Sequence, residues 1–176
     1  MIKNIKIIAK KVLPLAGYEL LTRVYNQLSW LVDSRGVKSK KIFLELKDKH
    51  KGGRCFVIGN GPSLNNMNLS LLKDEITIGM NRIYLLFPKI GFSTSYYVAV
   101  NGLVVEQYAR EIEEVNSIKF VNWLTRRHVK TKSDCFYIND PSGGHDIKFS
   151  KNPLRKTYFD STVTFASMQL AYWMGF

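Results

Sequence analysis

Short apolar runs separated by polar stretches recur along most of the chain. The runs are Cys55–Ile58, Ile76–Met80, Tyr96–Val100, Ile118–Trp123 and Cys135–Ile138. Several of them end abruptly in Asn or Gly, the residues that most often mark turns. Each run is long enough for one strand and too short for an ordinary helix, so the sequence predicts five buried strands.

Helical patterns separate several of these runs. One, with Ile83, Leu86 and Phe87, is predicted to stop at Pro88. Others have apolar stripes at helical spacing, which are Leu103, Val104, Tyr108, Ile112 and Val115, and then Val163, Ala166, Leu170 and Trp173. The alternation favours an α/β fold, a Rossmann-like parallel sheet with crossover helices. A further strand is expected after Phe176, so we expect a chain truncated at its C-terminus.

The turn after the first run has the composition of an anion site. Gly59 and Gly61 can take a positive φ and allow close approach of a ligand, and Pro62 suits the first turn of a helix. Asn60 and Ser63 add polar side chains beside free amides. Such a strand-to-helix corner can bind phosphate, although an ordinary turn without a ligand has the same composition.

Asparagines follow the ends of three predicted strands. Asn60, Asn81 and Asn101 each come within two residues of a strand end. In an open parallel sheet the carboxyl ends of the strands border one crevice, where ligands bind. Asn is also common in turns, but its recurrence at three such corners favours a site for a base, ribose or phosphate.

The basic charge is concentrated near the N-terminus. Of the net charge of +12, residues 1–54 contribute +9, from 13 Lys/Arg and 4 Asp/Glu. Residues 1–50 are therefore expected to form a basic, amphipathic helical arm and linker, and residues 51–176 the Rossmann-like domain. Residues 33–53 hold one short periodic piece and are expected to form a linker plus a helix that leads into the first strand. Pro14 and Gly17 are predicted to interrupt the arm.

Residues 1–32 combine lysines with apolar positions at helical spacing. The apolar run is cut by Lys10 and Lys11, so it is too short to span a bilayer, and it has no clean signal-peptide core. A helix of this kind can lie on an anionic membrane surface. The alternative is a helix packed on the domain's own core. Nucleic acid is a weaker third possibility, because no recognition motif accompanies the charge.

Cys55 and Cys135 lie in two of the apolar runs. They are expected to be buried thiols in a reducing compartment, since two such cysteines make no disulfide framework and no zinc-type spacing. The expected location is therefore the cytoplasm, with possible association with the inner face of the cytoplasmic membrane.

The last third holds the candidate acid–base groups, His128 and His145, in a long polar stretch. Solvated loop histidines without a catalytic role are commoner. Asp160 or Ser161 can cap the last predicted helix, and Ser161 and Thr162 make its N-terminus a second candidate phosphate site. An ordinary helix cap explains the same residues.

Four stretches together resemble the MptE-like family, whose namesake is an archaeal 6-hydroxymethyl-dihydropterin diphosphokinase. They are Gly59–Leu64, Gly79–Tyr84, Tyr97–Asn101 and Ser161–Thr164, the last followed by Gln169–Tyr172. The resemblance covers about residues 50–176. The same landmarks are similar to those of bacterial CMP-sialic-acid-dependent sialyltransferases.

The sialyltransferase resemblance implies a nucleotide site. Its positions carry over to Asn60, Gly61, Ser63, Asn81 and Asn101, with Ser161–Thr162 approaching the nucleotide. Two departures stand against it. Gly102 replaces the proline of that family's Asn-Pro-Ser segment, and the family's catalytic histidine has no counterpart, since neither His128 nor His145 matches it.

The resulting hypothesis is a nucleotide-utilising transferase. It would transfer a sugar from a nucleotide-activated donor, with CMP-linked donors favoured, to a glycan acceptor in surface-polysaccharide synthesis, and it would require no cofactor. Arg82 would offset phosphate charge. One alternative is the pterin diphosphokinase, which would use ATP and Mg²⁺ and for which Asp140 and Asp146 are the only candidate carboxylates. The other is an inactive nucleotide-binding or assembly module.

Overall fold

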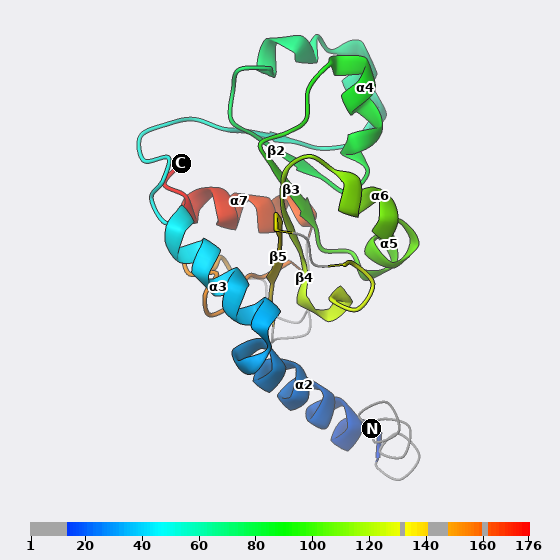
Figure 1. Ribbon diagram of the computed structural model, residues 1–176, viewed down its shortest axis with the longest axis vertical. Helices are drawn as coiled ribbons and strands as arrows, with labels where there is room; N and C mark the ends of the chain where they lie inside the picture. Colours follow the sequence, from blue (N-terminus) through cyan, green and yellow to red (C-terminus); the bar gives the residue numbers. More distant parts are fainter. Residues whose placement is uncertain (1–13, 131–132, 141–147, 160–161) are drawn as a thin grey trace.

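A computed structural model describes residues 14–130, 133–140, 148–159 and 162–176. Five parallel strands form one sheet in the order β1-β2-β3-β4-β5 (Figure 1). The strands are β1 (Phe56–Ile58), β2 (Thr77–Met80), β3 (Tyr96–Ala99), β4 (Ile118–Asn122) and β5 (Cys135–Ile138). The predicted α/β class is confirmed, and each apolar run forms a strand. The runs exceed the strands by single residues, which are Cys55, Ile76, Val100 and Trp123. Trp123 opens a 3₁₀ helix after β4.

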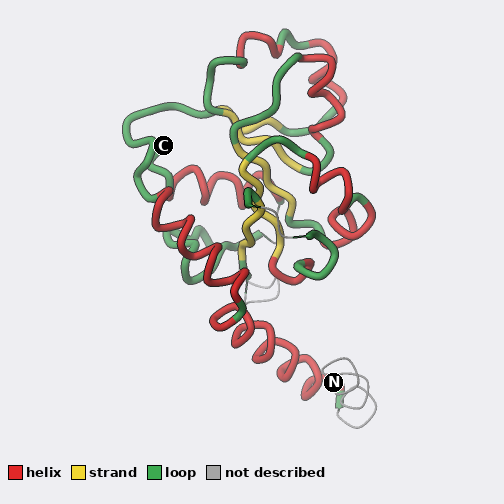
Figure 2. The backbone as a smooth tube through the Cα atoms, viewed as in Figure 1, coloured by secondary structure: helices red, strands yellow, loops and turns green. Residues whose placement is uncertain are grey.

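Helices flank this sheet as two outer layers. The α-helices are α2 (Leu15–Val32), α3 (Ser34–Leu46), α4 (Phe87–Ile90), α5 (Gly102–Gln107), α6 (Ala109–Glu114) and α7 (Val163–Trp173). The 3₁₀ helices are η1 (Pro62–Asn66), η2 (Leu69–Leu72), η3 (Ile83–Leu86) and η4 (Trp123–Thr125). The connecting helices α4, α5 and α6 lie on one side of the sheet, and α3 and α7 on the other (Figures 1 and 2). Right-handed crossovers between sequential neighbours explain why the connections share one face.

Two helix predictions are wrong in detail. Pro88 does not stop a helix, because it lies in the first turn of α4, where its missing N–H costs nothing. The stretch predicted as one helix over residues 103–115 is two short helices, which Tyr108 separates with a φ of −120°. The connections are therefore built largely from short helices.

The helix α3 belongs to the core. It packs against β5, and Phe43 and Leu46 are fully buried in the same cluster as the strand residues. Phe43 stacks on Phe120 of β4 at a centroid distance of 5.5 Å. The helix predicted within residues 33–53 is α3, which takes up most of this stretch and covers one face of the sheet.

The arm continues from α3 as α2. Gly17 lies inside this helix and does not interrupt it, whereas Pro14 is its N-cap. The pattern at residues 2–12 lies outside the described residues. Among the helices that the structure describes, none is long and apolar enough to cross a membrane.

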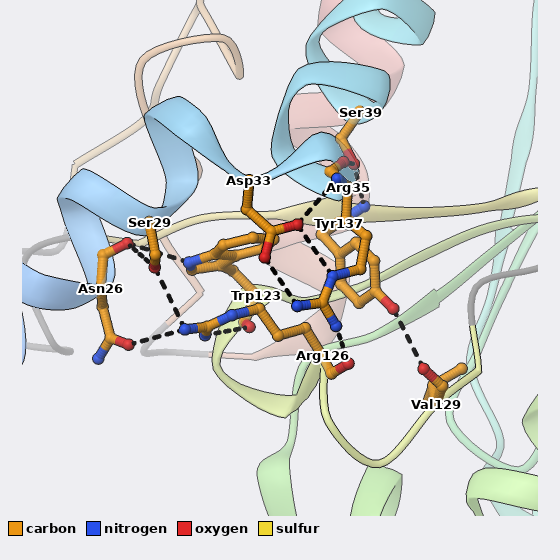
Figure 3. Close-up of polar contacts among 9 residues, drawn as sticks. All are labelled: Asn26, Ser29, Asp33, Arg35, Ser39, Trp123, Arg126, Val129 and Tyr137. Carbon is orange, nitrogen blue, oxygen red and sulfur yellow. Dashed lines mark hydrogen bonds and ion pairs between the residues drawn. The ribbon is translucent and has the colours of Figure 1, made fainter. Parts of the chain in front are cut away.

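A polar cluster fixes the elbow between α2 and α3 (Figure 3). Arg126, buried after η4, donates to Trp123 O at 3.0 Å and to Asn26 Oδ1 and Ser29 Oγ on α2. Its guanidinium carbon lies 4.2 Å from the Trp123 ring centroid. Arg35 on α3 bridges Asp33 and the carbonyl of Arg126. Both helices are therefore bonded to the segment that leaves β4.

The two predicted buried thiols are unequal. Cys135 is buried, and that burial raises its pKa to about 11. Cys55 is only half-buried, although burial also raises its pKa. Thiols with raised pKa values are poor nucleophiles at neutral pH, so neither cysteine is a candidate catalytic group.

The turn after α3 interlocks with the end of α7. The amides of Asp48 and His50 donate to the carbonyls of Trp173 and Met174, at 3.0 and 2.8 Å. The His50 ring stacks on Phe176, and its Nε2 lies 2.7 Å from the Tyr96 hydroxyl. The C-terminal end of α7 is thus tied to both α3 and the sheet.

This contact predicts a pH-dependent stability. Burial, together with Lys49, lowers the pKa of His50, so the unfolded chain takes up this proton at a higher pH than the folded chain. Neutral His50 therefore contributes to the free energy of unfolding. This contribution is fully present above the unfolded pKa of about 6.5 and is lost as the pH falls through the lower pKa of the folded chain. His50→Phe keeps the ring and removes the titration. Between pH 8 and pH 5, the free energy of unfolding measured in urea should fall less for the variant than for the native chain. Equal decreases would show that His50 does not cause this pH dependence.

Candidate functional site

A cavity opens where the carboxyl ends of β1 and β2 meet. Its volume is about 290 Å³. The residues that line it are Asn60, Gly61, Pro62, Asn65, Arg82, Ile83, Leu85 and Leu86. Four residues that the sequence nominated, Asn60, Gly61, Pro62 and Arg82, are therefore brought together. Asn65, Ile83, Leu85 and Leu86 were missed, because η1 and η3 bring them in only once both strand ends are placed.

Backbone amides supply the donors at this cavity. Among the described residues, the amides of Asn60, Gly61 and Ser63 have no protein acceptor, whereas Leu64 N donates to Gly61 O at 3.2 Å. Free amides grouped in one turn favour an anion. The helix expected after this corner is not an α-helix with a macrodipole, because Pro62 opens a five-residue 3₁₀ helix.

Gly59 and Gly61 do not use the positive φ that glycine allows. Gly61 has a φ of −75°, and Gly59 is not among the residues with positive φ. A Cβ at Gly59 would meet nothing within 4 Å, and one at Gly61 would approach only Ser63 Oγ, at 3.8 Å. What these glycines provide is open space beside the amides, which a ligand can enter.

Asn81 has the left-handed conformation instead. Its φ is 48°, in a region that Asn tolerates better than most residues. Its amide donates to Val98 O at 3.1 Å, and its carbonyl accepts from the Tyr97 hydroxyl. The side-chain Oδ1 is buried and has no hydrogen-bond partner among the described residues. A buried amide oxygen without a donor is costly unless a ligand or water supplies one.

Arg82 is held at the mouth of the cavity by an aromatic ring. Its guanidinium carbon lies 4.2 Å from the Tyr108 ring centroid. The residue remains exposed. Stacking on tyrosine limits the orientations of a guanidinium while leaving its N–H groups accessible. Arg82 can therefore present a fixed positive charge to an anion at the β1–β2 edge.

Asn101 serves the fold at the end of β3. Its Oδ1 accepts from Leu103 N and Val104 N, at 3.0 and 3.3 Å, which makes it the N-cap of α5. It does not line the cavity. Asn122, which sequence reasoning missed, is buried at the end of β4 and donates to Val100 O at 2.9 Å. The asparagine pattern therefore mixes capping residues with site residues.

The N-terminus of α7 lies near β2. Thr162 caps this helix by accepting from Phe165 N at 3.1 Å, so the cap is neither Asp160 nor Ser161 as predicted. Thr164 Oγ1 lies 3.5 Å from Met80 Sδ, one residue before Asn81. Ser161 lies outside the described residues. The start of α7 is therefore close to the β2 end of the edge, as the second predicted phosphate site requires.

Of the two candidate acid–base groups, the described residues include only His128, which does not lie at the cavity. His128 is exposed after η4, beyond β4, and does not line the cavity. His145 and Asp146 lie outside the described residues, and Asp140 is buried after β5. The described residues contain no group of three or more His, Cys, Asp or Glu that could hold a metal ion.

Comparisons of the chain with protein-family models, with curated proteins and with solved structures returned no match.

Proposed function

We propose that the chain is a nucleotide-utilising transferase that binds its nucleotide at the β1–β2 edge. The observation that carries the proposal is a cavity lined by Asn60, Gly61 and Arg82, whose guanidinium stacks on Tyr108. Among the described residues, the amides of Asn60 and Gly61, and of Ser63 in the same turn, have no protein acceptor. Amides together with a guanidinium are complementary to phosphate oxygens. The edge is also where open parallel sheets bind nucleotides.

The residues at this edge have distinct proposed roles. Asn60, Gly61 and Ser63 donate backbone N–H groups to the phosphate, and Arg82 offsets its charge. Asn81 does not line the cavity but precedes Arg82, which does. Its buried Oδ1, which lacks a donor among the described residues, is proposed to accept from a ribose hydroxyl or a base amino group. The volume of about 290 Å³ is close to the lower limit of about 300 Å³ for small-molecule sites. The cavity thus suits the phosphate and adjoining sugar, with the base extending past its rim.

The reaction that this arrangement favours is transfer of a sugar from a nucleotide-activated donor. Hydrogen-bond donors and a positive charge at the phosphate would stabilise the negative charge of the leaving nucleotide. The fixed site would orient the anomeric carbon toward an acceptor hydroxyl. The resemblance to sialyltransferases makes a CMP-linked sugar the first donor to test, with a surface glycan as acceptor.

Thermal unfolding with CMP, CDP, UDP, GDP and ATP, each with and without Mg²⁺, tests the binding step. A nucleotide at 100 times its Kd should stabilise the folded chain by about 2.7 kcal/mol. Removing a charged hydrogen-bond donor from phosphate typically costs about 1.5–3 kcal/mol, so Arg82→Gln should weaken binding at least about tenfold. Isothermal titration of the variant measures this loss.

Arg110→Gln is the matched control, because Arg110 is an exposed arginine on α6 that does not line the cavity. Equal affinities for Arg82→Gln and the native chain would refute the assigned role of Arg82. Stabilisation by ATP only with Mg²⁺ would favour the diphosphokinase. Absence of any shift with the native chain would refute the nucleotide site.

A further inference from the structure

An unpartnered apolar stripe runs along α2. Its six residues are 45–80% exposed and are Leu20, Leu21, Val24, Leu28, Leu31 and Val32. At 100° per residue they occupy an arc of about 120° on the helix surface. Exposed apolar residues this numerous on one helix face exceed the scattered leucines of an ordinary surface.

The other face of α2 docks on the domain. Trp30 packs edge-on against Trp123 at 5.2 Å between ring centroids, and Trp123 Nε1 donates to Asn26 O at 3.1 Å. Arg126 adds bonds to Asn26 and Ser29 (Figure 3). The remainder of α2 projects from the body of the molecule (Figure 1). The stripe is therefore held at a fixed orientation and faces away from the protein's own core.

Positive charge accompanies the stripe. Residues 1–32 contain five Lys/Arg and one acidic residue, of which Arg23 and Glu19 belong to α2 and the other four Lys/Arg precede the described residues. Where the stripe ends, Leu31 lines a hollow of about 460 Å³ together with Arg155 and Lys156. Exposed leucines can enter the acyl region of a bilayer, and neighbouring cations can bind its anionic headgroups.

We propose that α2 lies in the interface of an anionic phospholipid bilayer, with its leucine stripe in the acyl boundary and the flanking cations on the headgroups. A second copy of the chain fits less well, since pairing two stripes would bring together two segments that each carry +9 over residues 1–54. Since α2 is hydrogen-bonded to Trp123 and Arg126, which follow β4, binding of α2 to the bilayer would hold the carboxyl end of β4 near the lipid. The inference does not depend on the proposed transferase activity.

Co-sedimentation of the full chain with vesicles tests the proposal without any substrate. Binding is expected to vesicles of phosphatidylglycerol and phosphatidylcholine, and to be weaker with phosphatidylcholine alone or in 1 M salt. Leu20→Gln/Leu28→Gln should lower the partition coefficient at least about tenfold, because two leucines no longer enter the acyl boundary. Thermal melting of the variant confirms that the domain is still folded.

Met67→Gln/Leu71→Gln is the control, since both residues are exposed on or beside the 3₁₀ helices after β1. This pair should bind vesicles like the native chain. Equal losses in the two double variants, or no binding of the native chain to anionic vesicles, would overturn the proposal. So would a native dimer in sedimentation velocity that only the Leu20/Leu28 variant loses, because the stripe would then belong to a second copy.

Discussion

Replacing Gln169 with leucine should lower the free energy of unfolding by about 3 kcal/mol or more, because buried backbone groups lose their partners. Gln169 is 1% exposed on α7. Its Oε1 accepts from Ser150 N at 2.9 Å and from Tyr158 N at 3.1 Å, and its Nε2 donates to the carbonyls of Tyr158 and Phe165. One side-chain amide thus bonds two positions of the segment between β5 and α7, Ser150 and Tyr158, to the helix.

Urea unfolding measures this loss, and hydrogen exchange locates it. The amides of Ser150 and Tyr158 should lose protection in Gln169→Leu before the strands do. Met168→Leu is the control, because Met168 is the exposed neighbour on the same helix, and it should change stability by less than about 0.5 kcal/mol. A Gln169→Leu variant as stable as this control would show that other groups or water satisfy the two amides.

The sheet was predictable because its strands are buried. Each apolar run coincides with a strand to within one or two residues at either end, and the Cys135–Ile138 run coincides with β5. A parallel strand covered on both faces consists mostly of apolar residues, so an apolar run marks where it begins and ends. Lys119 on β4 is an exception to this composition. The short 3₁₀ helices were less predictable, since one or two turns contain too few residues to show a period.

The candidate site was predictable only in part. Gly59 to Ser63 and Arg82 were found because glycine, proline and asparagine at a strand end have local meaning. The different roles of Asn81 and Asn101 could not be separated, because capping depends on the next helix and burial depends on the neighbouring strand. Asn122 was missed because it lies inside the fourth apolar run, whose last residue, Trp123, does not belong to β4.

The arm shows a different limit of sequence reasoning. The periodic leucines of α2 suit either a buried face or a surface-seeking one, and only the position of Trp30 against Trp123 tells which side is docked. Gly36 marks the same elbow. A Cβ there would lie 2.3 Å from the Trp30 carbonyl oxygen. Glycine is therefore required by the close contact between α2 and α3, which the local sequence does not reveal.

Loss of the Asp134 carboxylate should destabilise the fold by about 3 kcal/mol, the lower end of the range for stranding a buried charge. Lys119, on β4, is fully buried, and its Nζ donates to Asp134 Oδ2 at 2.6 Å. It also donates to the carbonyls of Val115 and Ser117, at 2.6 and 3.2 Å. In Asp134→Ala the ammonium keeps only these neutral acceptors, which offset less of its desolvation than a carboxylate does.

The double variant Lys119→Met/Asp134→Ala distinguishes a stranded charge from lost packing. Methionine fills the buried space of the Lys119 side chain without a charge. Replacement of a buried ion pair by apolar residues is often neutral or stabilising. The double variant should therefore unfold at a higher urea concentration than Asp134→Ala alone, while Glu106→Ala, which removes an exposed carboxylate on α5, should resemble the native chain. If the double variant is less stable than the single one, the lysine contributes through its carbonyl contacts, and the ion pair is not what makes Asp134 necessary.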